Sequence, residues 1–219
     1  DYGSALEYVT IDRAAPGHSS AIPDDTIPDD LRQPDAIVGC VISNELLDSF
    51  PARRFVIKDG EPQELFVVVK DGHLASEPAT PSTPLIADRL APVIDGLEDG
   101  YVGEVCLGFS AWANEVSRMI DRGYVLSVDY GYPRADLYAA VRREGTLRCY
   151  YQHTLNANPF QHVGEQDISV HVDFTAVSEA LEAREFETIL LSSQSDFLSQ
   201  MGLDEFKESL RSAGLPPRE

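Results

Sequence analysis

The stretch VISNELLDSF, residues 41–50, places three side chains capable of chemistry directly after an apolar run: Asn44, Glu45 and Asp48. The apolar run is typical of a strand buried on both faces, and Pro51 ends the short helix expected after it. Ligands of open α/β sheets bind at the carboxyl ends of the strands. Glu45 and Asp48, three residues apart, would share one face of this helix and could together hold a planar guanidinium through charge-assisted hydrogen bonds.

A structural role for the same acids is equally consistent with the sequence. Ser43 or Asn44 can cap the helix expected over residues 45–50. Acidic side chains in a first helical turn are also stabilised by the helix dipole. Both interpretations of Glu45 and Asp48 stay open at this point.

Two further acids end apolar stretches. Asp12 closes ALEYVTID, residues 5–12, and Asp129 follows the apolar part of YVLSVDYG. In a doubly wound sheet, these strand ends and the end of the strand expected over residues 36–43 would converge on one crevice. Asp12 suits hydrogen bonding to ribose hydroxyls, or the commoner role of a turn former. Asp129 and Tyr130 would offer a carboxylate and a phenol to the same crevice.

The histidines do not have the spacing of a metal site. His153, His162 and His171 form neither an HxxxH nor an HxH pattern, so we expect no metal, and hydrogen bonding in the core or in loops is their expected role. The cysteines, 3 in number, are widely spaced, which favours reduced thiols in an intracellular protein.

The charge of the chain excludes one class of partner. The 219 residues include 37 Asp and Glu against 17 Lys and Arg, and the formal net charge of -20 repels phosphate backbones and anionic membrane surfaces. No apolar run approaches the ~18 residues of a membrane span. We therefore expect neither nucleic acid as a partner nor a membrane span, and a cytoplasmic location.

The rest of the sequence predicts the elements that must position these residues. Asp59-Gly60 and Asp71-Gly72 permit tight hairpin turns, so residues 51–80 are expected to form an antiparallel β-meander. Residues 131–173 are long, aromatic and polar, which predicts an extended excursion over a site. The remaining patterns predict a helix after Thr83, a helix from Ser110 that ends at Arg122-Gly123, a helix from Asp173, a strand over residues 186–193 and two short helices split by Gly202.

Several long stretches resemble the MidA-like methyltransferases. They are VISNELLDSFPARRFV, GEVCLG, VLSVDYGYP, GTLRCYYQH and NPFQHVGEQDISVHVDFTAV. The resemblance runs from about Leu6 to the last helices. Mitochondrial members of that family assist the assembly of respiratory complex I and methylate an arginine on one of its subunits.

The resemblance implies an α/β fold of the class I methyltransferase type, a Rossmann-like doubly wound sheet that uses S-adenosylmethionine. It places Asp12 at the ribose and Asn44 beside the cofactor, at the end of the fourth strand. It also makes Asn44, Glu45 and Asp48 the catalytic group, in which the two acids hold the guanidinium. The residues expected to bind the substrate are Asp129, Tyr130, His171 and Asp173.

The same family suggests the partners. We expect a protein substrate, with a respiratory complex I subunit as the candidate, and a second copy of the chain in a homodimer. The location would be mitochondrial in a eukaryote.

One part of the family pattern is absent from the sequence. The family begins with a strand and a glycine-rich loop that lets backbone amides approach the cofactor, and no GxGxxG occurs here. We therefore expect residues 1–219 to be one partial methyltransferase domain, incomplete at the N-terminus, that belongs to a longer enzyme or needs another chain. The rival hypothesis is a non-catalytic protein-interaction module that lacks cofactor binding. A Ser/His/Asp hydrolase is not supported, because the sequence has no GxSxG.

Overall fold

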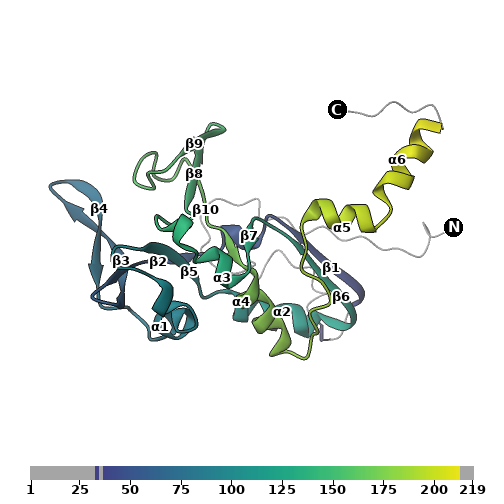
Figure 1. The fold of residues 1–219 in the computed structure, drawn as a ribbon, viewed down its shortest axis with the longest axis horizontal. Helices are drawn as coiled ribbons and strands as arrows, with labels where there is room; N and C mark the ends of the chain where they lie inside the picture. Colours follow the sequence, from purple (N-terminus) through teal and green to yellow (C-terminus); the bar gives the residue numbers. More distant parts are fainter. Residues whose placement is uncertain (1–32, 35–36, 213–219) are drawn as a thin grey trace. The chain divides into compact units, whose positions relative to one another are not determined.

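The computed structural model describes residues 33–34 and 37–212, and Figure 1 shows their fold. The chain divides into two compact units. The boundary along the sequence lies between Phe186 and Glu187, and each unit is described by itself. Asp12 and the strand expected over residues 5–12 lie outside the described residues. No helix of the described ranges is long and apolar enough to cross a membrane.

A pair of parallel strands forms one half of the first unit. β1 (Ile37–Asn44) lies beside β6 (Ile120–Val128), and after a register shift between Ile37 and Val38 the pairing continues without a break to their last residues. The helices α2 (Phe109–Met119) and α4 (Phe174–Glu182) pack against one face of this pair (Figure 1). They bury an apolar core with these residues at its centre: Leu47, Phe50, Phe109, Trp112, Val116, Val172 and Val177.

The sheet formed by β1 and β6 has two strands among the described residues, so the doubly wound sheet stays a prediction. The helix expected to end at Arg122-Gly123 ends at Met119 instead, and β6 begins at the next residue. This expectation was wrong because Gly123 lies inside the ladder, opposite Gly39 of β1, where the pairing of two backbones outweighs the local signal of a helix end.

An antiparallel sheet forms the other half. Its strands lie in the order β4-β3-β2-β5. Two tight turns with positive φ at Asp59-Gly60 and Asp71-Gly72 connect the first three strands. The helix α1 (Leu85–Leu90) and the short η3 (Ile94–Gly96) contribute to a second core beneath the sheet. The strands are β2 (Ala52–Lys58), β3 (Glu61–Lys70), β4 (His73–Ala79) and β5 (Val102–Cys106).

The segment 131–173 contains more regular structure than the sequence indicated. A three-stranded sheet in the order β10-β8-β9 projects from it, and β7 pairs in parallel with β11. Its elements are β7 (Gly131–Tyr132), α3 (Arg134–Leu137), η4 (Ala140–Arg142), β8 (Arg148–Tyr151), β9 (Thr154–Asn156), β10 (Asp167–Ser169) and β11 (Val172–Asp173).

The second unit contains α5 (Gln194–Gln200) and α6 (Leu203–Ser212), with Gly202 between them at a φ of 85°. The strand expected over residues 186–193 is not formed. Ile189, in its middle, is 74% exposed. The apolar run predicted a strand, but strand formation also depends on pairing with another backbone, which the local sequence does not determine.

Candidate functional site

Polar side chains gather where β1 and β6 end. Asn44, the last residue of β1, is exposed and lies opposite Val128. The next residue, Glu45, has a φ of 48°, and its backbone N–H donates to the Val128 carbonyl at 2.9 Å. This left-handed residue turns the chain into the short 3-10 helix η2 (Leu47–Ser49), so that Asp48 returns toward the end of β6.

Asp129 fixes this turn. Its Oδ2 accepts hydrogen bonds from the backbone N–H groups of Leu47 at 2.8 Å and Asp48 at 3.4 Å, and its Oδ1 accepts one from the N–H of Tyr130 at 2.8 Å. Asp129 thus caps η2 from a distant part of the chain, which corrects the expectation that Ser43 or Asn44 would cap it. The Ser43 hydroxyl instead donates to the Ser127 hydroxyl at 2.9 Å.

A third segment joins the two turns. The N–H of Val170 donates to the Asp48 carbonyl at 3.1 Å, and the N–H of Val172 donates to the Tyr130 carbonyl at 2.8 Å. Gly131 is required here, because a Cβ at this position would lie 2.2 Å from the Val172 carbonyl oxygen. Asp129 therefore caps η2, and Tyr130 presents an exposed phenol. Gly131 allows the backbone of Val172 to lie close to its own.

Burial and neighbouring charges raise the pKa values of Asp48 and Tyr130 at these strand ends. Burial, followed by the charges of Asp129 and Glu45, raises the pKa of Asp48 to about 6. Burial also raises the pKa of Asp129, against the lowering effect of its backbone hydrogen bonds. The charge of Glu45, and its hydrogen bond with the phenol, raise the pKa of Tyr130. We call Asn44, Glu45, Asp48, Asp129 and Tyr130 the acidic rim.

His171 lies between Val170 and Val172, in the segment that joins the two turns, but it contacts a different group of residues. Its backbone N–H donates to the Thr146 hydroxyl at 3.0 Å, and its ring lies 5.5 Å from the ring of Tyr132. Burial, followed by the positive charges of Arg148 and Arg142, lowers the pKa of the imidazole. His171 is therefore a neutral side chain at neutral pH, and its buried Nδ1 has no partner among the described residues.

Asp173 caps a helix and forms a buried ion pair in this structure. Its Oδ1 accepts from the N–H of Ala176 and so caps α4, while its Oδ2 pairs with the buried Arg134 at 3.1 Å. The same guanidinium binds Glu179 through two hydrogen bonds of 2.8 and 2.6 Å, and Glu179 also pairs with Arg89 of α1. These bonds favour a structural role for Asp173, and its role as a substrate ligand stays a prediction.

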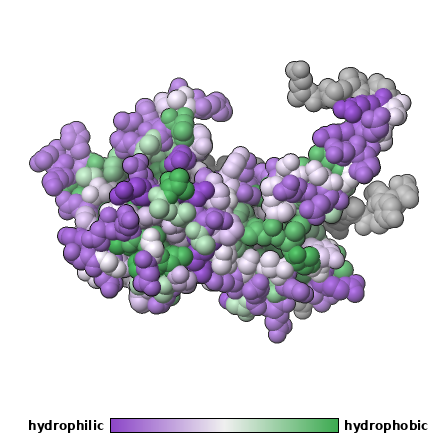
Figure 2. Space-filling view, viewed as in Figure 1, coloured by the Kyte–Doolittle hydropathy of each residue, from purple (hydrophilic) through white to green (hydrophobic). Residues whose placement is uncertain are grey.

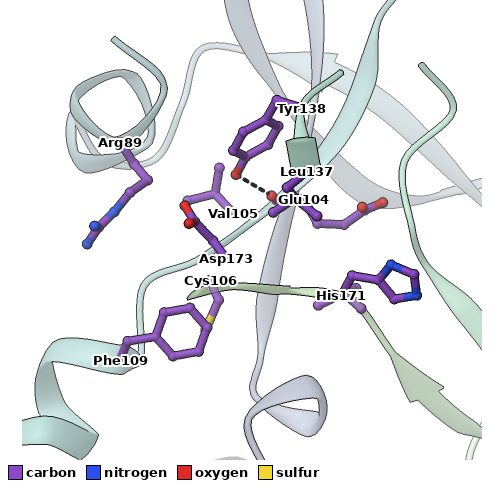
Figure 3. A pocket seen from close by; sticks show the side chains of 10 residues that line it. Arg89, Glu104, Val105, Cys106, Phe109, Leu137, Tyr138, His171 and Asp173 are labelled. Carbon is purple, nitrogen blue, oxygen red and sulfur yellow. Dashed lines mark hydrogen bonds between the residues drawn. The ribbon is translucent and has the colours of Figure 1, made fainter. Parts of the chain in front are cut away.

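Glu104 is a buried acid that sequence reasoning missed. Its Oε2 accepts hydrogen bonds from the N–H and the hydroxyl of Thr146 at 2.8 and 3.1 Å, and its Oε1 lies 3.6 Å from the Arg54 guanidinium. Figure 3 shows Glu104 and His171 at a small cavity, with the Tyr138 hydroxyl donating to the Glu104 carbonyl. The available signal was a lone acid inside the apolar strand sequence VGEVC, because a buried charge needs a partner.

The structure thus brings together five of the predicted residues in the acidic rim, and the linking segment bonds to it through Val170 and Val172. A further aromatic side chain, Tyr150 of β8, lies close enough for its charge to raise the pKa of Tyr130. Across residues 33–34 and 37–212, no group of three or more His, Cys, Asp or Glu is placed to hold a metal ion.

Known proteins resemble this chain over most of its length. Residues 22–191 match the family model described as "Putative S-adenosyl-L-methionine-dependent methyltransferase". A crystal structure from Burkholderia thailandensis, described as "a COG1565 superfamily member and likely methyl transferase" bound to S-adenosyl-homocysteine, is 33% identical, with a TM-score of 0.63 over 69% of this chain and 39% of that one. A second crystal structure from the same organism, of an uncharacterised protein, is 32% identical, with a TM-score of 0.64 over 73% of this chain and 41% of that one.

The chain thus spans about two fifths of the length of these two structures. No curated protein matches it.

Proposed function

The chain belongs to the family of S-adenosyl-L-methionine-dependent methyltransferases, and from this premise we propose that the protein methylates the side chain of an arginine in a protein substrate. The observation that carries the proposal is the acidic rim at the carboxyl ends of β1 and β6, where Asp48 has a pKa raised to about 6 by burial and by neighbouring acids. Such a group of carboxylates is completed electrostatically by a cation.

A guanidinium fits this rim by shape as well as by charge. It presents five N–H donors in a plane, which two carboxylates can accept together. In our proposal Glu45 and Asp48 hold the guanidinium, and Tyr130 covers it with an aromatic ring that also attracts cations. Asp129 is a positioning residue, because its oxygens are engaged by the backbone of η2 and of Tyr130.

The described residues fit part of a cofactor site. Asn44 presents an exposed amide, which both donates and accepts hydrogen bonds, at the strand end where ligands of α/β sheets bind. We propose that Asn44 holds the cofactor there and that Asp12, outside the described residues, binds its ribose. The cofactor supplies an activated methyl group, and the protein supplies orientation and complementary charge.

The raised pKa of Asp48 links substrate binding to protons. A guanidinium beside Asp48 favours the ionised carboxyl, so binding lowers the pKa of Asp48 from about 6. At a pH near 6, arginine binding therefore releases protons, and binding becomes stronger as the pH rises toward neutrality.

The experiment is transfer of a labelled methyl group from S-adenosylmethionine to a peptide that contains arginine or, as a control, lysine. We expect label in the arginine peptide, at least a tenfold loss in the Glu45→Gln variant, and little change in Glu115→Gln, an exposed acid of α2. Equal labelling of both peptides would reject the arginine assignment. S-adenosylhomocysteine binding without any transfer to arginine would reject it as well.

A second candidate is the interaction module without catalysis. It is favoured by the exposed apolar and aromatic side chains of the projecting sheet, among them Tyr150 and Leu155. The two candidates differ in one observable, because only the methyltransferase binds S-adenosylhomocysteine. A respiratory complex I subunit as substrate, a homodimer, and a cytoplasmic or mitochondrial location remain predictions.

A further inference from the structure

A groove separate from the acidic rim lies beside α1. It has a volume of about 410 Å³, which falls in the range of roughly 300–1,000 Å³ for ligand sites. The turn between β2 and β3, the helix α1 and η3 line it: Gly60, Glu61, Pro62, Ala87, Ala91, Ile94, Asp95 and Leu97. Figure 2 shows hydrophobic atoms among hydrophilic ones on the lobe that carries α1.

The walls of the groove are fixed by the fold. The Asp99 carboxylate accepts hydrogen bonds from the N–H groups of Asp59 and Gly60 at 3.1 and 3.0 Å, which holds the β2–β3 turn. Leu97 forms the floor and is buried in the second core. A ligand therefore meets a surface that needs no reordering before binding, which reduces the entropic cost of association.

The lining combines an apolar floor with an acidic edge. Ala87 and Ala91, one helical turn apart, leave room for a side chain above Leu97. Glu61 and Asp95 are exposed at the edge, and no Lys or Arg is among the lining residues. This arrangement suits a ligand that has an aliphatic part and a positive charge.

The charge distribution decides between possible occupants. A second copy of the chain carries the same net charge of -20 and would be repelled. Residues 1–32 and 187–212 of the chain itself also contain more Asp and Glu than Lys and Arg. A basic segment of another protein meets both the apolar and the electrostatic requirement.

We propose that this groove binds a basic segment of a partner protein, with an aliphatic side chain above Leu97 and a neighbouring Lys or Arg at Glu61 and Asp95. The interaction does not involve the cofactor. The proposed binding of a basic segment in this groove is therefore independent of whether the protein methylates arginine.

The test is fluorescence anisotropy with a short labelled peptide in which Leu and Lys alternate, since an arginine peptide would also be a ligand of the acidic rim under the proposed function. We expect the double variant Glu61→Gln/Asp95→Asn to bind about tenfold more weakly, because it removes the edge charges. Ala87→Phe, at an exposed position, should weaken binding to a similar extent by filling the groove. Thermal melts of each variant establish that the fold is retained.

The matched control is Asp121→Asn/Glu144→Gln, which removes two exposed acids away from the groove lining. We expect this control to bind within about twofold of the parent chain, since its groove is intact. An equal loss in the control would show that overall charge attracts the peptide and would overturn the proposal. Unchanged binding by Ala87→Phe would overturn it too. Self-association of the parent chain that Ala87→Phe abolishes would assign the groove to a second copy instead.

Discussion

At the scale of single residues, the acidic rim is the feature that links sequence to chemistry. Glu45, Asp48 and Asp129 come from positions that the sequence already placed at strand ends, and the structure brings them close enough to change the pKa of Asp48. Such clusters of coupled acids are common at functional sites, because a fold optimised for stability alone would separate them.

The pKa of Asp48 predicts how stability depends on pH. The folded chain, with a pKa of about 6 for this group, holds the proton more tightly than the unfolded chain, whose value is 3.8. The stability that Asp48 contributes is therefore complete below about pH 4 and is lost as the pH rises toward 6. The Asp48→Asn variant lacks this loss, so its stability relative to the parent chain should increase between pH 4 and 7.

Urea unfolding at several pH values measures this difference. The exposed Asp121→Asn serves as the control. Parallel pH profiles for the parent chain and Asp48→Asn would show that the carboxyl of Asp48 is not perturbed.

The roles of individual residues were predictable only in part. The strand-end position of Asp129 was visible in the sequence, but its capping of η2 was not, because Leu47 and Asp129 are 82 residues apart. The bonds of Asp173 to Arg134, and of Glu104 to Thr146, were missed for the same reason. Contacts between distant segments leave no local pattern.

At the scale of elements, an ion network with the buried pair Arg134 and Asp173 at its centre joins three helices. Arg134 of α3 contacts Asp173 at the start of α4 and Glu179 within α4, and Arg89 of α1 contacts Glu179. Contact with Glu179 and Asp173 raises the pKa of Arg134, and the bond from Arg134 lowers the pKa of Glu179. The network therefore connects the antiparallel half of the first unit to the parallel half.

Removal of one partner from this network should be costly. Asp173→Ala removes both the cap of α4 and a buried partner of Arg134, so we expect a loss of about 3–5 kcal/mol in the free energy of unfolding. Asp173→Asn keeps an oxygen that can cap the helix and should lose less. Chemical denaturation measures both values, and a loss below about 1 kcal/mol for Asp173→Ala would contradict this account.

Local signals predicted some elements well and others poorly. Asp-Gly turns and the Asp173 cap act within a few residues, and the structure has both turns and the capped helix at these positions. The absent strand over residues 186–193 and the short strands of 131–173 depend on which backbone lies beside them. Pairing partners far along the chain decide such elements, and local sequence does not contain that information.

At the scale of the whole molecule, the net charge of -20 is the dominant feature. Repulsion among like charges destabilises a compact state, and salt screens it over a distance of about 8 Å at 0.15 M. We therefore expect the melting temperature to rise by a few degrees when sodium chloride is increased from low to moderate concentration. Differential scanning fluorimetry measures this, and an unchanged or falling melting temperature would show that local ion pairs outweigh the repulsion.

In the acidic rim, this strongly acidic chain places several carboxylates close together at the carboxyl ends of β1 and β6. The family comparison establishes the cofactor class, and the rim supports the choice of arginine as the acceptor. Because the chain spans about two fifths of the solved relatives, a test that needs no complete cofactor site is the most direct.

That test is an NMR titration of the Asp48 carboxyl carbon against pH, with and without an arginine-containing peptide. The control peptide carries norleucine in place of arginine. We predict that the arginine peptide lowers the pKa of Asp48 from about 6, since a bound guanidinium stabilises the ionised carboxyl, and that the norleucine peptide leaves it unchanged. A pKa of Asp48 that stays the same with a saturating amount of the arginine peptide would contradict the claim that the acidic rim holds a guanidinium.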